Sequence, residues 1–272
     1  MREQEKYRIC VTALKDYVAN AHFDDVVIGL SGGIDSSVTA VMCVDAFGAD
    51  HVHGVLLPGP YSTDHSVDDA AALAHALDIE THTMSICEPY HAFNAEFKRV
   101  WDHELDGLAS ENTQARCRMV CLMALSNAHR WMLVNTGNKS EAMMGYSTLY
   151  GDTAGAFAPL GGLYKTDVYA LGRWRNRDAT DHGMQLPIPE HVFIKPPSAE
   201  LAPEQQDEKS LGIDYASLDR ILIDLFELNE DVDTVAEKSD DAEFVRHVYA
   251  TAQACAYKRA MEPPYPDTLF YR

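Results

Sequence analysis

Residues 26–37 read Val-Val-Ile-Gly-Leu-Ser-Gly-Gly-Ile-Asp-Ser-Ser, and this stretch decides the fold. Val26 to Leu30 is a continuous apolar run, which is typical of a buried parallel strand. The glycine-rich residues after it predict a tight turn, and residues 36–47 predict a helix. Such a turn aims backbone N–H groups and the positive end of the helix dipole at one spot, which suits phosphate. Asp35 would repel phosphate unless a cation such as Mg2+ lay between them.

Strand and helix patterns alternate along the first half of the chain. The other predicted strands are 52–57, 79–86 and 131–134, and the other predicted helices are 5–21, 66–77, 89–105 and 113–129. This alternation predicts an α/β fold, a doubly wound parallel sheet flanked by helices. Phosphate sites in such sheets lie at the carboxyl ends of strands, where residues 31–37 and 135–141 both fall. Further on, 213–228 and 242–261 predict helices, and the proline-rich stretch 187–203 predicts an ordered or ligand-gated loop.

Composition narrows the class of protein. A chain of 272 residues can form one large domain, and we expect a single domain over 1–272. No apolar run approaches the ~18 residues that a membrane span needs. The six cysteines contain no Cys-x-x-Cys pair, so neither zinc nor a disulfide framework is indicated, and we expect a reduced, cytoplasmic protein. A net charge of −20 argues against nucleic acid as the main partner.

The stretch Asn135-Thr-Gly-Asn-Lys-Ser-Glu141 repeats the strand-to-helix arrangement of the first motif. Thr136 could hydrogen-bond a nucleotide, and Glu141 could meet a metal ion or a ligand hydroxyl. The alternative is a polar helix cap, because Asn138 to Glu141 has the pattern of one.

Two further residues are candidates for phosphate contacts. Lys165, in Leu163-Tyr-Lys-Thr166, could offset charge on the α-phosphate of ATP during adenylyl transfer. The alternative is an ordinary solvent-exposed lysine. Ser198, in Lys195-Pro-Pro-Ser-Ala-Glu-Leu201, could contact phosphate, and the alternative there is a rigid turn.

The loop Ser31-Gly-Gly-Ile-Asp-Ser36 lacks the Gly-Lys-Ser/Thr ending of a Walker loop. It resembles instead the pyrophosphate loop of ATP pyrophosphatases, which cut ATP between its α- and β-phosphates and transfer AMP to an acceptor oxygen. An ordinary glycine turn is the alternative.

Several motifs in one order extend this resemblance to almost the whole chain, which is similar to the NAD synthetase family. The segments that carry it are 31–36, 111–116 (Glu-Asn-Thr-Gln-Ala-Arg), 136–141, 150–152 (Tyr-Gly-Asp), 163–166, 195–201 and 211–215 (Leu-Gly-Ile-Asp-Tyr). The resemblance implies an adenine nucleotide alpha hydrolase-like fold.

The resemblance also implies roles for particular residues. Asp35 and Lys165 would be catalytic, Asp35 would hold Mg2+, and Glu141 would hold a second Mg2+ or contact the deamidated dinucleotide. Asn112, Arg116 and Lys258 would contact that dinucleotide too; for Arg116 a surface ion pair is the alternative. The residues that would bind ATP are Gly29, Leu30, Ser31, Gly32, Gly33, Ile34, Asp35, Ser36, Thr136, Lys165 and Ser198. Leu149 and Tyr257 depart from the ammonia-using pattern, which makes the dinucleotide contacts harder to assign than the ATP contacts.

By this resemblance we expect ATP-dependent amidation of nicotinic acid adenine dinucleotide to NAD+ by a homodimer. Glutamine-dependent members carry an amidase domain ahead of this region, and only about 25 residues precede the first strand here. We therefore expect ammonia as the nitrogen donor, with a separate glutaminase subunit as the alternative. Two other functions stay open: another pyrophosphate-loop enzyme, such as a tRNA-modifying ligase, and a non-catalytic nucleotide-binding protein.

Overall fold

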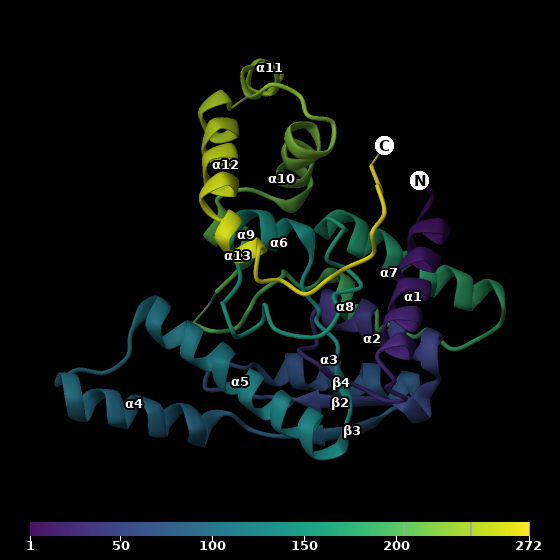
Figure 1. Cartoon of the computed structure of the whole chain (residues 1–272), viewed down its shortest axis with the longest axis vertical. Coiled ribbons are helices and arrows are strands. Elements are labelled where there is room, and N and C mark those ends of the chain that lie inside the picture. Colours follow the sequence, from purple (N-terminus) through teal and green to yellow (C-terminus); the bar gives the residue numbers. More distant parts are fainter. Residues whose placement is uncertain (204, 240, 272) are drawn as a thin grey trace.

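Four parallel strands form one sheet in the computed structural model, which describes residues 1–203, 205–239 and 241–271 (Figure 1). The strands are β1 (Val26–Gly29), β2 (Val52–Leu56), β3 (Glu80–Thr83) and β4 (Met132–Leu133), in the spatial order β3-β2-β1-β4. In the register, Val26 pairs with Val52 on one side and with Met132 on the other. The chain thus winds outward from β1 in both directions, and the crevice between β1 and β4 is the switch point at which such sheets bind ligands.

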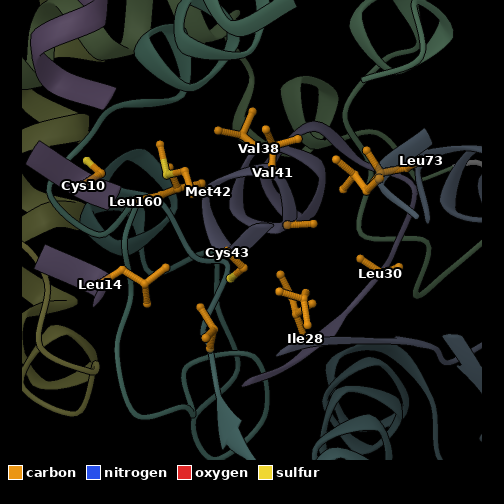
Figure 2. Close-up of a cluster of buried hydrophobic side chains, with 14 of the residues drawn as sticks. Cys10, Leu14, Ile28, Leu30, Val38, Val41, Met42, Cys43, Leu73 and Leu160 are labelled. Carbon is orange, nitrogen blue, oxygen red and sulfur yellow. The ribbon is translucent and has the colours of Figure 1, made fainter. Parts of the chain in front are cut away.

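Helices cover both faces of the sheet, as the sequence predicts. On one face lie α1 (Glu3–Asn20), α2 (Ile34–Phe47), α3 (Asp64–Leu77) and α7 (Lys165–Asp181), and Figure 2 shows Ile28 of β1 among Leu14, Met42 and Leu73 there. On the other face lie α4 (Cys87–Trp101) and α5 (Gly107–His129), which pack against Val27. Successive residues of β1 therefore enter different cores, which explains the unbroken apolar run.

The C-terminal part forms a helical lobe beyond the carboxyl edge of the sheet (Figure 1). Its elements are α6 (Lys139–Met144), α9 (Asp207–Leu211), α10 (Tyr215–Leu222), a π-helix (Ile223–Glu227), α11 (Val232–Glu237), α12 (Ala242–Ala254) and α13 (Ala256–Arg259). The short helix α8 (His191–Ile194) lies outside the lobe and packs against α2. A separate apolar core, which includes Tyr164, Leu222 and Val248, holds α6, α10, α11 and α12 together. Helix α6 belongs to this lobe and follows β4 in the chain, so its start lies near the carboxyl end of that strand.

The structure moves several predicted boundaries. Helix α5 begins at Gly107 and not at residue 113. Its first turns were not predicted because they are polar and carry no apolar periodicity. Strand β3 is shorter than the predicted 79–86, since it is an edge strand that pairs only with β2. The segments 213–228 and 242–261 are each divided, the first by a π-helix and the second at Cys255. In the described part of the chain, no helix is both long and apolar enough to span a membrane.

Candidate active site

The loop between β1 and α2 is shaped by its own serines. Ser31 Oγ accepts a hydrogen bond from the Gly33 backbone N–H at 3.2 Å and lies 3.0 Å from Ser36 Oγ. Ser36 Oγ in turn donates to the Gly33 carbonyl at 3.1 Å. Gly33 is the N-cap of α2 and offers no side-chain cap, so the first N–H groups of that helix remain available to a ligand.

Gly32 is the residue of this loop that only glycine can fill. Its φ is +72°, and an added Cβ would lie 2.2 Å from the carbonyl oxygen of Ser66 in α3. We expect Gly32→Ala to raise the KM for ATP at least about tenfold and to lower stability by about 1–3 kcal/mol, because both the loop and α3 must shift. Steady-state kinetics and thermal unfolding measure the two effects.

Gly183→Ala is the matched control for this prediction. Gly183 has a similar φ of +67°, but a Cβ there meets nothing within 4 Å. Its substitution carries the backbone strain without the clash, so the KM for ATP should stay at the wild-type value. Equal kinetics in the two variants would contradict the role given to the Gly32–Ser66 contact.

Lys165, Asp35 and Glu141 form one charged cluster beside the loop. Lys165 Nζ donates to Asp35 Oδ2 at 2.6 Å and to Glu141 Oε1 at 3.0 Å. The lysine side chain is only 2% exposed, so the alternative of a solvent-exposed lysine is wrong. The two carboxylates are 18% and 20% exposed. One buried cation therefore bridges two acids that come from different helices.

The surroundings raise the pKa of both Lys165 and Glu141, which favours the charged form of the lysine and the neutral form of the acid. Burial lowers the pKa of Lys165, but the paired carboxylates Asp35 and Glu141 more than offset this, so the pKa stays well above its usual range. Burial raises the pKa of Glu141, which shares the lysine with Asp35 and also faces Asp207. Lys165 thus keeps its positive charge within the cluster, and a cation beside Glu141 would stabilise the charged form of that acid.

Asn138 both caps helix α6 and contacts Asp35 of the charged cluster. Its side-chain oxygen accepts from the Glu141 backbone N–H at 3.1 Å, so the predicted cap at the start of α6 is confirmed. Its Nδ2 donates to Asp35 Oδ1 at 2.8 Å. The cap therefore also fixes the carboxylate of Asp35 in the loop of residues 31–36, which is called the phosphate loop below.

A cavity of about 710 Å³ opens over this cluster at the carboxyl edge of the sheet. Most of the residues expected from the sequence line it: Gly29, Leu30, Ser31, Gly33, Ile34, Asp35, Ser36, Asn112, Thr136, Glu141, Lys165, Ser198 and Lys258. Lys258 Nζ donates to the carbonyls of Gly145 and Ser147 at 2.7 and 2.6 Å. Arg116 does not line the cavity; it is exposed on α5, and its Nε donates to the Leu149 carbonyl at 3.1 Å.

Comparison with known proteins agrees with this geometry. A family model described as NAD synthase matches residues 6–262. The chain belongs to the NAD synthase family. A glutamine-dependent NAD(+) synthetase of Thermotoga maritima is 44% identical over 259 residues, which cover 95% of this chain and 44% of that protein. The chain spans about half the length of the curated relatives it matches.

Solved structures of similar length share the fold. An NMN synthetase from Francisella tularensis matches with a TM-score of 0.77 and 30% identity, covering 95% of this chain and 96% of that one. An NH3-dependent NAD synthetase from Campylobacter jejuni matches with a TM-score of 0.73 and 28% identity, again covering 95% and 96%. The resemblance and the α/β fold expected from the sequence are both confirmed.

In this NAD synthase family member, sequence reasoning missed Arg118. The side chain lines the cavity, its Nε donates to the Leu57 carbonyl at 3.1 Å, and burial lowers its pKa. Arg118 shares a face of α5 with Ala115, three residues before it, and Leu122, four residues after it, whereas Arg116, two residues before it, faces elsewhere. That periodicity was the available signal. Asp207, a buried acid that lines the cavity and whose pKa is raised by burial, was missed too, and so was Asp152, which also lines the cavity.

Asp219 of α10 supports the charged cluster from behind. It is 1% exposed and accepts from Ser140 Oγ at 2.5 Å and from the Thr166 N–H at 2.8 Å. The Lys165 N–H donates to the same Ser140 Oγ at 2.8 Å. We expect Asp219→Ala to lower the free energy of unfolding by about 3 kcal/mol, because buried donors lose a charged acceptor, and to reduce turnover severalfold. Urea denaturation and steady-state assays measure this.

Asp214→Ala provides the comparison for Asp219→Ala. Asp214 is the exposed N-cap of the same helix, where its side chain accepts from the Ser217 N–H at 2.9 Å. Its loss should cost about 1 kcal/mol and leave turnover unchanged. If Asp219→Ala were no more harmful than Asp214→Ala, the supporting role of Asp219 would be wrong.

Proposed function

We propose that the chain catalyses the ATP-dependent amidation of nicotinic acid adenine dinucleotide to NAD+, releasing AMP and pyrophosphate. The observation that carries this is the convergence on one cavity of the phosphate loop, Lys165, Asp35 and Glu141. The relatives named as glutamine-dependent NAD(+) synthetases support the same product.

In the first step the nicotinate carboxylate attacks the α-phosphate of ATP and pyrophosphate leaves. The loop N–H groups at the start of α2 and the ammonium of Lys165 stabilise the charge that develops on the phosphoryl oxygens. The pKa of Lys165 stays high, so it acts as a fixed cation and does not exchange protons. Thr136 and Ser198 line the same cavity and would hold the nucleotide.

The site suits Mg2+. Asp35 and Glu141 present hard carboxylate oxygens that already converge on one cation, the Lys165 ammonium, at 2.6 and 3.0 Å. In the described part of the chain, no three metal-ligating side chains come together. Mg2+ is commonly held by one or two carboxylates together with substrate phosphates, and here it would neutralise the charge of the departing pyrophosphate.

In the second step ammonia attacks the acyl-adenylate and expels AMP. In the first step both reacting groups belong to large ligands, so much of its rate comes from positioning. Asn112 and Lys258 line the cavity and would hold the dinucleotide. The Asn112 side-chain oxygen accepts from Thr148 Oγ1 at 2.7 Å, which fixes its amide orientation.

The first experiment measures pyrophosphate release by the purified chain with ATP, Mg2+ and ammonium. Release that requires nicotinic acid adenine dinucleotide and equals the NAD+ formed would support the proposal. Release without NAD+ would point to another acceptor, and no release would favour a non-catalytic protein or a missing partner. Binding of tRNA at low salt would favour a tRNA-modifying ligase.

Ammonia is the nitrogen donor that we propose for this chain by itself. The match to an NH3-dependent NAD synthetase over nearly the full length of both chains supports it. The curated relatives are glutamine-dependent and about twice as long, which supports the alternative of a separate glutaminase. Turnover with ammonium and with glutamine is compared on the isolated chain, and efficient use of glutamine would overturn the ammonia proposal.

A second candidate product is NMN, because the chain is 30% identical to an NMN synthetase that it matches over 95% of its own length and 96% of the other chain. The same assay with nicotinic acid mononucleotide separates the two products. Higher kcat/KM with the mononucleotide than with the dinucleotide would move the assignment to NMN.

We propose that the chain forms a homodimer through the outer faces of α4 and α5. These two helices expose large apolar side chains, which favours burial against a partner: Phe93, Val100, Trp101, Leu108 and Val120. Arg116 lies four residues before Val120, hence on the same face of α5. The family resemblance implies that the dinucleotide binds near the subunit interface, and a dimer of this kind would place Arg116 close to it.

Sedimentation of the wild type and of Val120→Asp tests the dimer. We expect a wild-type dimer and a folded variant that is largely monomeric. A monomeric wild type at micromolar concentration would contradict the proposal.

A further inference from the structure

The side chain of Glu200 lies at the N-terminus of α3, far from it in the sequence. Glu200 Oε2 accepts from the Thr63 N–H at 3.1 Å, and Oε1 accepts from Thr63 Oγ1 at 2.9 Å and from Ser66 Oγ at 2.6 Å. Glu200 is held at a φ of 49°, a left-handed conformation that is uncommon for glutamate. Three hydrogen bonds from two residues thus converge on one carboxylate.

Helix α3 does not provide this carboxylate itself. Thr63 is its N-cap and accepts from the Ser66 N–H at 3.3 Å. A capping box would place glutamate or glutamine at the third helical position, where its side chain accepts from the N-cap N–H, but that position holds Ser66. Glu200 supplies the missing acceptor from 137 residues away, and its negative charge suits the positive end of the helix.

On one side of this contact lies the segment that carries Ser198. The Glu200 N–H donates to Ser198 Oγ at 3.1 Å, and Ser198 Oγ donates to the Gln205 carbonyl at 2.6 Å. Lys195 at the start of the segment also reaches α3, since its Nζ donates to Ser66 Oγ at 3.0 Å. Segment 195–202 is therefore joined to α3 at two points, and Ser198 lies between them.

On the other side lies the phosphate loop. The carbonyl oxygen of Ser66 occupies the space next to Gly32, where an added Cβ would come within 2.2 Å. The same residue thus contacts the loop through its backbone and Glu200 through its hydroxyl. Ser198 and this loop line the same cavity, so a movement of segment 195–202 away from α3 would change the distance between them.

We propose that Glu200 is a positioning residue for ATP: it joins segment 195–202 to α3 and so holds Ser198 opposite the phosphate loop. This inference rests on the proposed function only in taking ATP as the ligand of the cavity. Glu200 touches no reacting atom in this account; it acts through Ser198 and Ser66.

Hydrogen–deuterium exchange of the ligand-free chain tests the contact itself. In Glu200→Ala, exchange should become at least about tenfold faster in peptides covering 60–66 and 198–203, and stay unchanged in the sheet. Glu190→Ala is the control, because Glu190 is an exposed acid just before this segment, paired with Arg173 at 3.7 Å. Unchanged exchange at both places in Glu200→Ala would overturn the inference.

Kinetics distinguish positioning from a general loss of structure. Glu200→Ala should raise the KM for ATP about tenfold, with kcat and the KM for the dinucleotide within about twofold of wild type; Glu200→Gln, which keeps one acceptor oxygen, should fall between. A fall in kcat alone would indicate lost folding and overturn the inference. Calorimetry with ATP separates the two proposals: a wild type that binds no ATP overturns both, whereas equal ATP affinity in wild type and Glu200→Ala overturns this inference alone.

Discussion

Replacing Lys165 with alanine is expected to lower the rate of NAD+ formation by about 10²–10³-fold while the chain stays folded. The ammonium of Lys165 is fixed within 3.0 Å of both Asp35 and Glu141, on the wall of the cavity that also holds the phosphate loop. No other lysine or arginine contacts this pair of carboxylates in the part of the chain that the structure describes. Its loss removes the positive charge that would face the phosphoryl oxygens as pyrophosphate leaves.

The substitution should destabilise the fold less than the removal of one partner from a fully buried ion pair does. The two carboxylates left behind are partly exposed to the cavity, and the pKa of Glu141 is already raised by burial, so this acid can take up a proton. We therefore expect a loss of stability well below the 3–5 kcal/mol typical when a buried pair is broken.

Lys6→Ala is the control for Lys165→Ala. Lys6 is also buried, and its Nζ donates to both oxygens of Asp167 at 2.7 and 2.8 Å, two residues along α7 from Lys165. It should cost similar stability and leave turnover nearly unchanged. The measurement is NAD+ formed per folded chain, with folding checked by circular dichroism. If the two variants lost turnover equally, the loss would be structural and the catalytic role of Lys165 would be wrong.

Local sequence predicts the parts of the site that local structure makes. The strand, turn and helix around Ser31 to Asp35 follow one another within a dozen residues, so periodicity and glycine placement are enough. The cap at Asn138 is equally local, and it too is confirmed. Both lie at the switch point of the sheet, which the alternation of strands and helices already indicates.

Contacts between distant segments leave little trace in a single sequence. Lys165 meets Asp35 across 130 residues, and although its motif made it a candidate for a phosphate contact, nothing in that motif indicates Asp35 as its partner. The choice between Arg116 and Arg118 required the face of α5, which its polar first turns obscure. Glu200 shows the same limit, because its partner is the uncapped start of a helix more than a hundred residues earlier. Tertiary packing determines the positions of these residues, and local sequence patterns do not predict it.

Asp35→Asn should lower turnover at least about 100-fold and raise the Mg2+ concentration needed for half-maximal activity about tenfold. Asparagine has nearly the same shape, so the change removes a charge and one acceptor without leaving a cavity. It deprives Lys165 of its shorter contact, at 2.6 Å, and takes from Mg2+ one of two carboxylates that would hold it. Mg2+ titrations of NAD+ formation measure both effects.

Asp45→Asn on the same helix shows whether this effect is specific. Asp45 Oδ2 accepts from Tyr7 Oη at 2.6 Å and from Arg175 Nε at 2.8 Å, away from the cavity. Its replacement should lower the melting temperature but leave the Mg2+ dependence at the wild-type value. An Asp35→Asn enzyme with wild-type turnover and Mg2+ dependence would mean that the loop binds phosphate through its N–H groups and Lys165 alone. The acidic residue would then serve only to hold the lysine and the Asn138 cap in place.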